Sequence, residues 1–183
     1  MACELTKGRG LDCRDIMGGV KAVYFVQHAD ATIASSAGAV SDVDLSTNLF
    51  KYDLPRGTAS FTETIQPSQE NGTVFYEPSV NIKLHKLTVA DRNEIRLLAQ
   101  NRLLVFVETQ AVNASGNTLI WCLGLENGLE LSAGTSQSGA AFADMNGYDL
   151  TFTGAESAPF LLVAVYTSTP FDNAAFTVTI TNS

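Results

Sequence analysis

The chain has 183 residues, of which 45% are hydrophobic and 16% are charged, with 11 basic and 19 acidic side chains. This composition excludes an intrinsically disordered chain, and the length is sufficient for one globular domain with a full core. The net charge of −8 argues against a general nucleic-acid binder, which needs a basic surface.

The charge is unevenly distributed along the chain. All 11 basic residues lie between Lys7 and Arg102, together with 12 acidic residues in the first 102 positions, whereas residues 103–183 hold seven acidic and no basic residues. The acidic half is either a surface suited to solubility, or one that repels polyanions or meets the basic half of a neighbouring copy.

The cysteine pattern and the hydropathy predict a protein that is neither secreted nor membrane-bound. Cys3, Cys13 and Cys122 are odd in number and loosely spaced, which is not a disulfide framework and fits reduced thiols in the cytosol. Residues 1–10 lack the apolar segment of a secretory signal, and the longest apolar run, 160–166, is too short to span a bilayer.

The first 47 residues predict one strand between two segments without a core of their own. Residues 1–17 are polar and contain Gly8 and Gly10, so we expect an extended arm that frays or docks on a partner. Residues 20–27 contain a nearly continuous apolar run, which is typical of a strand covered on both faces. Residues 28–47 are small, polar and acidic, and they predict a long loop that is either flexible or ordered by another subunit.

The next segment predicts short antiparallel strands. We expect strands over 48–54, 59–65, 73–76 and 80–84, with turns at Pro55–Gly57 and Asn71–Gly72. Pro67 is expected to end one strand and Pro78 to interrupt another.

Residues 88–102 carry the only convincing helical pattern. Thr88 is the expected N-cap, with Asp91 as its capping-box partner, and Asn101 is the expected stop. Ile95, Leu98 and Ala99 form one apolar face, so we expect the helix to cover one face of a sheet.

The remaining segments again predict strands. They cover 103–108, 119–125, 129–131, 148–153, 160–167 and 175–181, with a hairpin turn at Asn127–Gly128. The sequence therefore predicts a mainly β fold, a β-sandwich or barrel of about nine to ten strands with one flanking α-helix. The expected organisation is an N-terminal arm (1–17), a sandwich (18–154) and C-terminal strands of the same domain (155–183).

No residue pattern predicts catalysis or a cofactor. His28 and His85 are expected to be surface histidines, and with Cys3 and Cys13 they lack the paired spacing of a zinc site. Residues 144–149 resemble a calcium loop only weakly, because the glycine comes too early and the closing Glu is missing. We therefore expect no enzyme activity, no catalytic residue, no metal and no cofactor.

Four stretches carry a resemblance to a known family. They are GLDCRDIMGGVKAVYF, ENGTVFYEPSVNIKL, LTVADRNEIRLLAQNR and GLENGLELSAGTSQSGAAFADMNGYDLTFTG. Together they resemble the major tail (tail tube) proteins of tailed bacteriophages over roughly residues 11–154. Residues 155–183 match nothing in that pattern.

The resemblance implies a structural virion protein whose hexameric rings stack into a hollow tail tube that conducts DNA. It implies a β-sandwich with a flanking helix, whose sheets join between subunits into an inner barrel, while the arm (1–17) and the loop (28–47) reach the next ring. The implied partners are further copies of the chain, other tail and head–tail connector proteins, and genomic DNA that passes without specific binding. The implied location is the virion tail, assembled in the host cytoplasm.

Two residue sets follow from this reading. A tube that conducts DNA should repel phosphate, which makes the acids flanking two turns candidates for the lumen: Glu126, Glu130, Asp144 and Asp149. The charged residues of the arm and the loop are candidates for contacts between rings: Arg9, Arg14, Asp42 and Asp44.

Three other readings remain open from the sequence. A tail terminator, connector or other virion ring protein would form a single ring. A non-enzymatic β-sandwich binding module on the host side, such as a carbohydrate-binding sandwich, would need exposed aromatic residues on one face, where the predicted strands offer mostly Thr, Ser and Asn. A hydrolase would need a nucleophile–base pair, for which two histidines offer little material.

Overall fold

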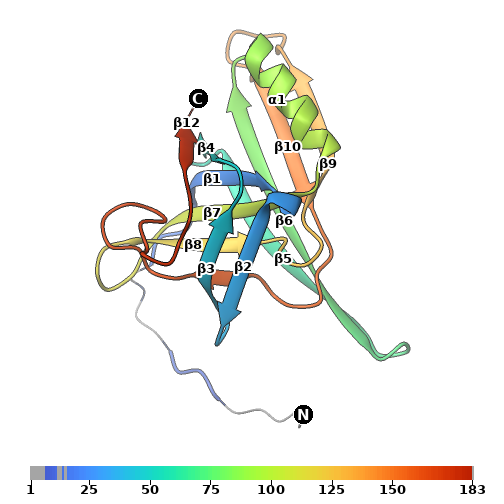
Figure 1. Cartoon of the computed structure of the whole chain (residues 1–183). Coiled ribbons are helices and arrows are strands. Elements are labelled where there is room, and N and C mark those ends of the chain that lie inside the picture. The colour runs from blue at the N-terminus through green and yellow to red at the C-terminus, as the bar shows by residue number, and fades with distance from the viewer. Residues whose placement is uncertain (1–6, 12–13, 15, 183) are drawn as a thin grey trace.

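A computed structural model describes residues 7–11, 14 and 16–182, which form twelve strands in two sheets and one α-helix (Figure 1). The mainly β fold with a single helix is thereby confirmed, with twelve strands instead of nine or ten. The strands are β1 Val20–Gln27, β2 Ala31–Ser36, β3 Ala39–Leu45, β4 Leu49–Asp53, β5 Ala59–Ser68, β6 Thr73–His85, β7 Leu103–Val112, β8 Thr118–Leu123, β9 Glu130–Gln137, β10 Gly147–Thr153, β11 Leu161–Val163 and β12 Ile180–Asn182. A short 3₁₀ turn, η1, spans His28–Asp30, and the helix α1 spans Val89–Gln100.

The larger sheet has eight strands in the order β12-β4-β1-β7-β8-β11-β3-β2. It curls, because residues from its two ends meet: the amide of Leu45 on β3 donates to the carbonyl of Thr177, which precedes β12, and the Thr177 amide donates to the Val43 carbonyl. The curled sheet and the C-terminal segment enclose a core that contains Tyr24, Phe106 and Phe171.

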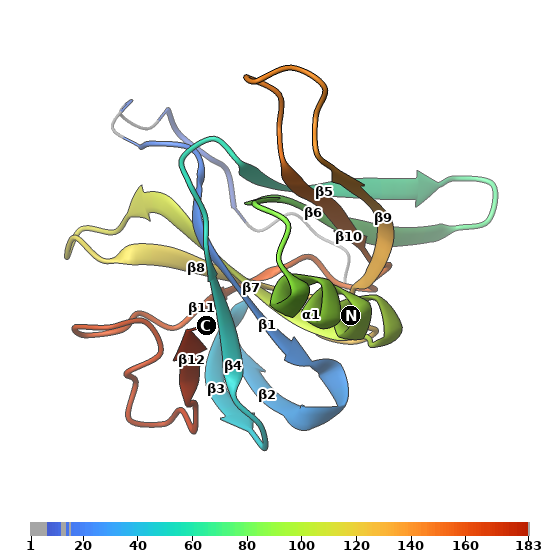
Figure 2. The ribbon, with the colours of Figure 1, turned by 90° about the horizontal axis from the view of Figure 1, so that it is seen from above.

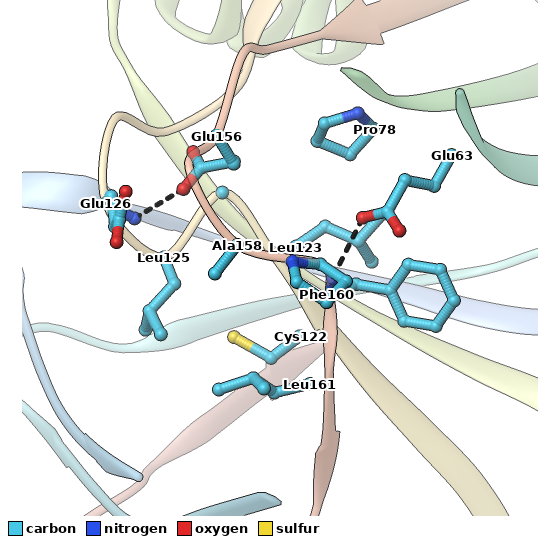
Figure 3. Close-up of a pocket in the computed structure, with 12 residues that line it drawn as sticks. Glu63, Pro78, Cys122, Leu123, Leu125, Glu126, Glu156, Ala158, Phe160 and Leu161 are labelled. Carbon is cyan, nitrogen blue, oxygen red and sulfur yellow. Dashed lines mark hydrogen bonds between the residues drawn. The ribbon is translucent and has the colours of Figure 1, made fainter. Parts of the chain in front are cut away.

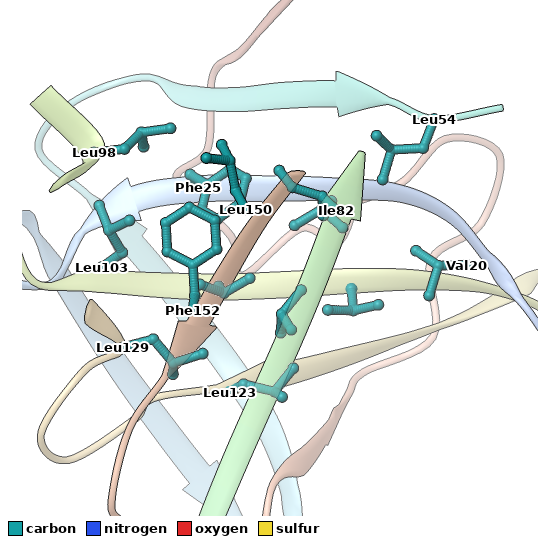
Figure 4. Packing of buried hydrophobic residues seen from close by; sticks show 14 of the residues in the cluster. Val20, Phe25, Leu54, Ile82, Leu98, Leu103, Leu123, Leu129, Leu150 and Phe152 are labelled. Carbon is teal, nitrogen blue, oxygen red and sulfur yellow. The ribbon is translucent and has the colours of Figure 1, made fainter. Parts of the chain in front are cut away.

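A second core lies between the two sheets. It contains Phe25 of the larger sheet and Ile82, Leu150 and Phe152 of the smaller sheet (Figure 4). Alternate residues of β1 therefore enter different cores, which explains why its sequence is a continuous apolar run and not an alternating one. The prediction of a strand covered on both faces is confirmed, with the bounds 20–27.

The smaller sheet has four antiparallel strands in the order β5-β6-β10-β9. Its two long strands, β5 and β6, pair over their whole shared length, from Ala59–Ile82 to Ser68–Thr73. β10 pairs only with the part of β6 from Ser79 to His85. The outer half of the β5–β6 hairpin therefore extends beyond the sandwich, as Figures 1 and 2 show.

The helix begins and ends as the sequence predicts. The amide of Asp91 donates to Thr88 Oγ1 at 3.0 Å, and the Thr88 hydroxyl donates to Asp91 Oδ2 at 2.6 Å. Asn101 is the C-cap, and its side-chain amide donates to the Leu97 carbonyl. Leu98 is the only fully buried helix residue, and it packs with Ile95 into the core between the sheets. The helix lies over one end of the four-stranded sheet, beside β9 (Figure 1).

The predicted long loop at 28–47 is wrong, because these residues form η1 and the hairpin of β2 and β3. Only Val40 and Val43 of this hairpin are fully buried. Its small polar residues thus gave no apolar alternation for a strand prediction to follow.

Four further boundaries differ from the predictions. The connection at Asn127–Gly128 joins the two sheets and is not a hairpin turn, since β8 pairs with β7 and β11 while β9 pairs with β10. Pro67 lies within the edge strand β5, where a missing N–H costs no sheet bond. Pro78 does not interrupt β6, because β10 has already ended there and the Pro78 carbonyl accepts from Gly154. The last two strands are only three residues each.

Candidate functional site

The outer face of the four-stranded sheet is polar. On β10, Tyr148, Leu150 and Phe152 point into the core, so the residues between them point outward. The register of β5, β6 and β9 places mostly Ser, Thr and Asn side chains beside them: Ser60, Thr62, Ser79, Asn81, Thr135, Thr151 and Thr153. This sheet face, the polar face below, presents hydroxyl and amide groups to the surroundings.

Two of the four acids predicted to line a lumen lie on the polar face. Asp149 accepts a hydrogen bond from Asn81 Nδ2 at 2.7 Å and lies 3.4 Å from Lys83 Nζ. Glu130 pairs across from Thr153 on the neighbouring strand, and it accepts from Arg102 Nε at 3.1 Å. The structure therefore brings Glu130 and Asp149 to one face.

The other two predicted lumen acids lie elsewhere. Glu126 is in the connection between β8 and β9, where its carboxylate accepts from the Ser157 amide. Asp144 is in the loop between β9 and β10, where its carboxylate accepts from the amides of Ala141 and Ala140, and these bonds hold its pKa below the usual value. Both carboxylates thus order their own loops.

The four-stranded sheet has two open edges. β5 and β9 are its outer strands, and no other strand of the described residues pairs with their outer sides. β9 is exposed at every residue except the partly covered Leu131. Unpaired N–H and C=O groups at such edges are templates for a strand from another chain.

The outer half of the β5–β6 hairpin, residues 64–77, forms a projection that is called the arm from here on and is distinct from the predicted N-terminal arm of residues 1–17. Ile65, Val74 and Phe75 are 59%, 53% and 40% exposed on it. Ile65 and Val74 lie on the same side as Phe61 and Val80, which contact the core between the sheets. The core-facing side of the hairpin therefore continues past the sandwich with nothing from the described chain over its end. The sequence predicted strands in this hairpin, but it could not predict that Ile65, Val74 and Phe75 are exposed, because their exposure depends on where β10 ends.

The candidates for contacts between rings are not brought together. Arg9 and Arg14 are exposed and precede β1, while Asp42 and Asp44 lie on β3. Oδ1 of Asp42 is shielded from solvent and has no hydrogen-bond partner among the residues that the structure describes.

A buried carboxylate lies at the end of the core inside the larger sheet. Glu108 is 1% exposed and accepts from Lys21 Nζ at 2.6 Å, Thr118 Oγ1 at 2.7 Å and the Tyr24 hydroxyl at 2.8 Å. Burial tends to raise the pKa of Glu108, but the bonds from Lys21, Thr118 and Tyr24 together lower it below its usual value.

The partners of Glu108 show that this cluster is structural. Burial, followed by the Glu108 charge, raises the pKa of Tyr24, and the hydrogen bond to Glu108 raises that of Lys21. Thr118 also contacts the Tyr166 hydroxyl at 2.6 Å. The cluster thus joins β1, β7 and β8 to the C-terminal segment, and each of these side chains is engaged by a neighbour.

The cavity between the sheets is small and its carboxylates are also occupied (Figure 3). Its volume is about 30 Å³, which admits a water molecule but no organic ligand. Glu156 accepts from the amides of Glu126 and Asn127, and Glu63 accepts from the amide of Phe160. These bonds fix the connections between the sheets.

The remaining chemical candidates show no assembled site. Within the described ranges, no three His, Cys, Asp or Glu side chains gather in a way that could hold a metal ion. His28 Nε2 lies 3.1 Å from the Leu125 carbonyl and His85 is exposed, while Cys3 and Cys13 lie outside the described residues. The buried Cys122 has a raised pKa because of its burial. The part of the chain that the structure describes holds no helix of the length and apolarity that a membrane span requires.

No protein-family model, curated protein or solved structure gives a significant match to this chain. The features of the molecule that bear on its function are the polar face, the open edges of the four-stranded sheet and the arm.

Proposed function

We propose that this chain is a non-enzymatic structural subunit that assembles with its own copies into hexameric rings, stacked as the tail tube of a bacteriophage. The observation that carries the proposal is the four-stranded sheet with open edges on both sides and a polar outer face. Edge-to-edge joining of β9 with β5 of the next copy would satisfy both edges and close the sheets into a barrel.

The polar face supports the conduction of DNA. In such a barrel the core-facing side of each sheet stays covered, so the polar face would line the bore. Its hydroxyl and amide groups lie among Glu77, Glu130 and Asp149, with Lys83 held beside Asp149. A bore with few free cations releases few counterions on contact with phosphate and therefore does not retain DNA.

Electron microscopy of negatively stained purified protein, over a range of concentrations, tests the proposal. Hollow stacked rings or long tubes are the expected result. Single closed rings at every concentration would instead favour a tail terminator or connector. A protein that stays monomeric throughout, as shown by light scattering of the same samples, would contradict self-assembly.

A further inference from the structure

The arm and the helix α1 lie at opposite ends of the same strand. β6 runs from Thr73 at the arm to His85 next to α1, which is 13 residues or roughly 40 Å of extended chain. Figure 1 shows the arm and α1 pointing to opposite ends of the molecule. The arm therefore cannot fold back onto the helix of its own copy.

The arm combines exposed apolar residues with negative charge. Residues 64–77 contain Glu70 and Glu77 and neither Lys nor Arg. Glu70 is exposed at the turn, and Glu77 accepts one hydrogen bond from Gln66 Nε2. Ile65 and Val74 are exposed on the core-facing side of the arm, whereas Glu77 lies on the opposite side, with the polar face. With Glu70 at the turn, the core-facing side would fit a surface that is apolar and basic.

The outer side of α1 has the complementary character. At 3.6 residues per turn, Val89, Arg92 and Arg96 fall on the side opposite the buried Leu98, and Leu97 lies next to them. Val89 and Leu97 are 75% and 51% exposed. No ion pair within the described residues involves Arg92 or Arg96.

The acids of the helix do not neutralise this surface. Asp91 is held in the N-cap by Thr88. Glu94 lines the groove between α1 and β4 with Phe50 and Tyr52, and Leu97 lies between this groove and the outer side of the helix. The two arginines are thus the charges of the outer side, with apolar side chains beside them.

We propose that the arm of one copy docks on the outer side of α1 of a second copy, with Ile65 and Val74 against Val89 and Leu97, and Glu70 at the turn facing Arg92 and Arg96. The inference rests on the proposed self-assembly and names its contact surface. Because donor and acceptor surfaces differ, the contact is heterologous and propagates from copy to copy in a ring or a filament. Exposed ion pairs alone contribute little, so the apolar contact supplies most of the affinity and the charges select the pairing.

Charge reversal of each surface in the full chain tests the proposal. We expect E70K and R92E/R96E each to weaken self-association at least tenfold, measured by sedimentation and by electron microscopy. A mixture of the two variants should recover association, because each lysine-bearing arm then meets a glutamate-bearing helix. The combined variant E70K/R92E/R96E should recover it as well. R56E, an exposed arginine on the β4–β5 turn, is the matched control and should assemble like the unmodified chain.

The outcomes separate this inference from the proposed function. If E70K and R92E/R96E both assemble like the unmodified chain, the docking surface is wrong while self-assembly stands. Loss of association without recovery in the mixture also overturns it, provided that circular dichroism shows both variants folded. If the unmodified chain never assembles, the proposed function fails together with the inference. A second test, V74D, should weaken association without any change in the charge of the helix.

Discussion

Glu108 shows how a single residue ties the ends of the fold together. Its carboxylate is buried, yet it receives hydrogen bonds from β1 and β8, and through Thr118 it reaches Tyr166 in the C-terminal segment. A buried charge is tolerated when its hydrogen-bonding capacity is satisfied in this way. Glu108 directly follows the apolar run of residues 103–107, at a position of β7 that faces the core. No feature of the sequence predicted that it pairs with Lys21.

The substitution Glu108→Gln should lower the free energy of unfolding by roughly 1.5–3 kcal/mol at neutral pH, because charge-assisted hydrogen bonds are lost in a buried site. The measurement is chemical unfolding with circular dichroism. Glu70→Gln removes an acid from the exposed arm turn and serves as the control with no expected effect.

The difference between the unmodified chain and Glu108→Gln should depend on pH. The folded pKa of Glu108 is lowered, so its stabilisation is complete above the unfolded value of about 4.3 and is lost as the pH falls through the folded pKa. The folded pKa of Lys21 is raised, so its part is complete below about pH 10.4 and is lost as the pH rises through its folded pKa. Repeating the unfolding measurement from pH 3 to 11 checks this: a difference that stays constant below about pH 4 would contradict the assignment.

At the scale of elements, the caps of α1 explain why a helix with one buried residue is formed at all. Packing contributes little to a helix whose outer residues are exposed, so the capping of its first turn carries more of its stability. We expect Thr88→Ala to cost about 1 kcal/mol and to reduce self-association, because the docking surface sits on this helix. Thr88→Ser keeps the hydroxyl that accepts from Asp91 and should behave like the unmodified chain in both unfolding and sedimentation.

The junction between β6 and β10 depends on a residue without a side chain. Gly147 has a φ of 157°, and a Cβ atom there would lie 1.9 Å from the Leu84 carbonyl oxygen. Gly147→Ala should therefore cost about 2 kcal/mol or more, because it separates the strands at their paired end. Gly18→Ala, where a Cβ atom has nothing within 4 Å, is the control. Thermal unfolding of both variants checks the prediction, and equal melting temperatures would refute it.

The elements that could be predicted from the sequence are those whose pattern reflects burial. β1 and α1 were found because an apolar run and a capped helical face are local signals. The β2–β3 hairpin was missed, and only the start of β9 was predicted, over 129–131, because Ala, Ser, Thr and Gly dominate these strands and they are mostly exposed. Partners far along the chain decide such strands, as β11 does for β3. The polar face and the exposed residues of the arm were harder still to predict from the sequence, because the exposure of the arm depends on the lengths of β5, β6 and β10.

For the whole molecule, the position of a charge on the sandwich decides its effect more than the net charge of −8. Glu130 is on the polar face, whereas Glu126 is in the connection between the sheets, although the two are exposed and close in sequence. The acid-only half of the sequence is thus not one surface. Only part of it would meet DNA in the proposed tube.

This difference gives a prediction for a phage that carries the protein. Glu130→Lys places a cation in the bore, and we expect slower DNA ejection, most strongly at low salt, with tube assembly unchanged. Glu126→Lys makes the same charge change outside the bore and should eject DNA at the normal rate. Ejection followed with a DNA-binding dye checks both predictions. Equal ejection rates for the two variants would contradict the proposal that the polar face lines the lumen.

The parallel pairing of β12 with β4 has a consequence for the timing of synthesis. Ile180 pairs with Leu49, so the ribosome adds the covering strand about 130 residues after the strand that it covers. At about 5–20 residues per second, the β4 edge of a nascent chain stays open for roughly 7–26 s. Neighbouring nascent chains on one messenger RNA can meet through this edge during that interval. A pause in translation before residue 180 would lengthen it, so synonymous codons in the last part of the gene should influence the yield of correctly folded protein.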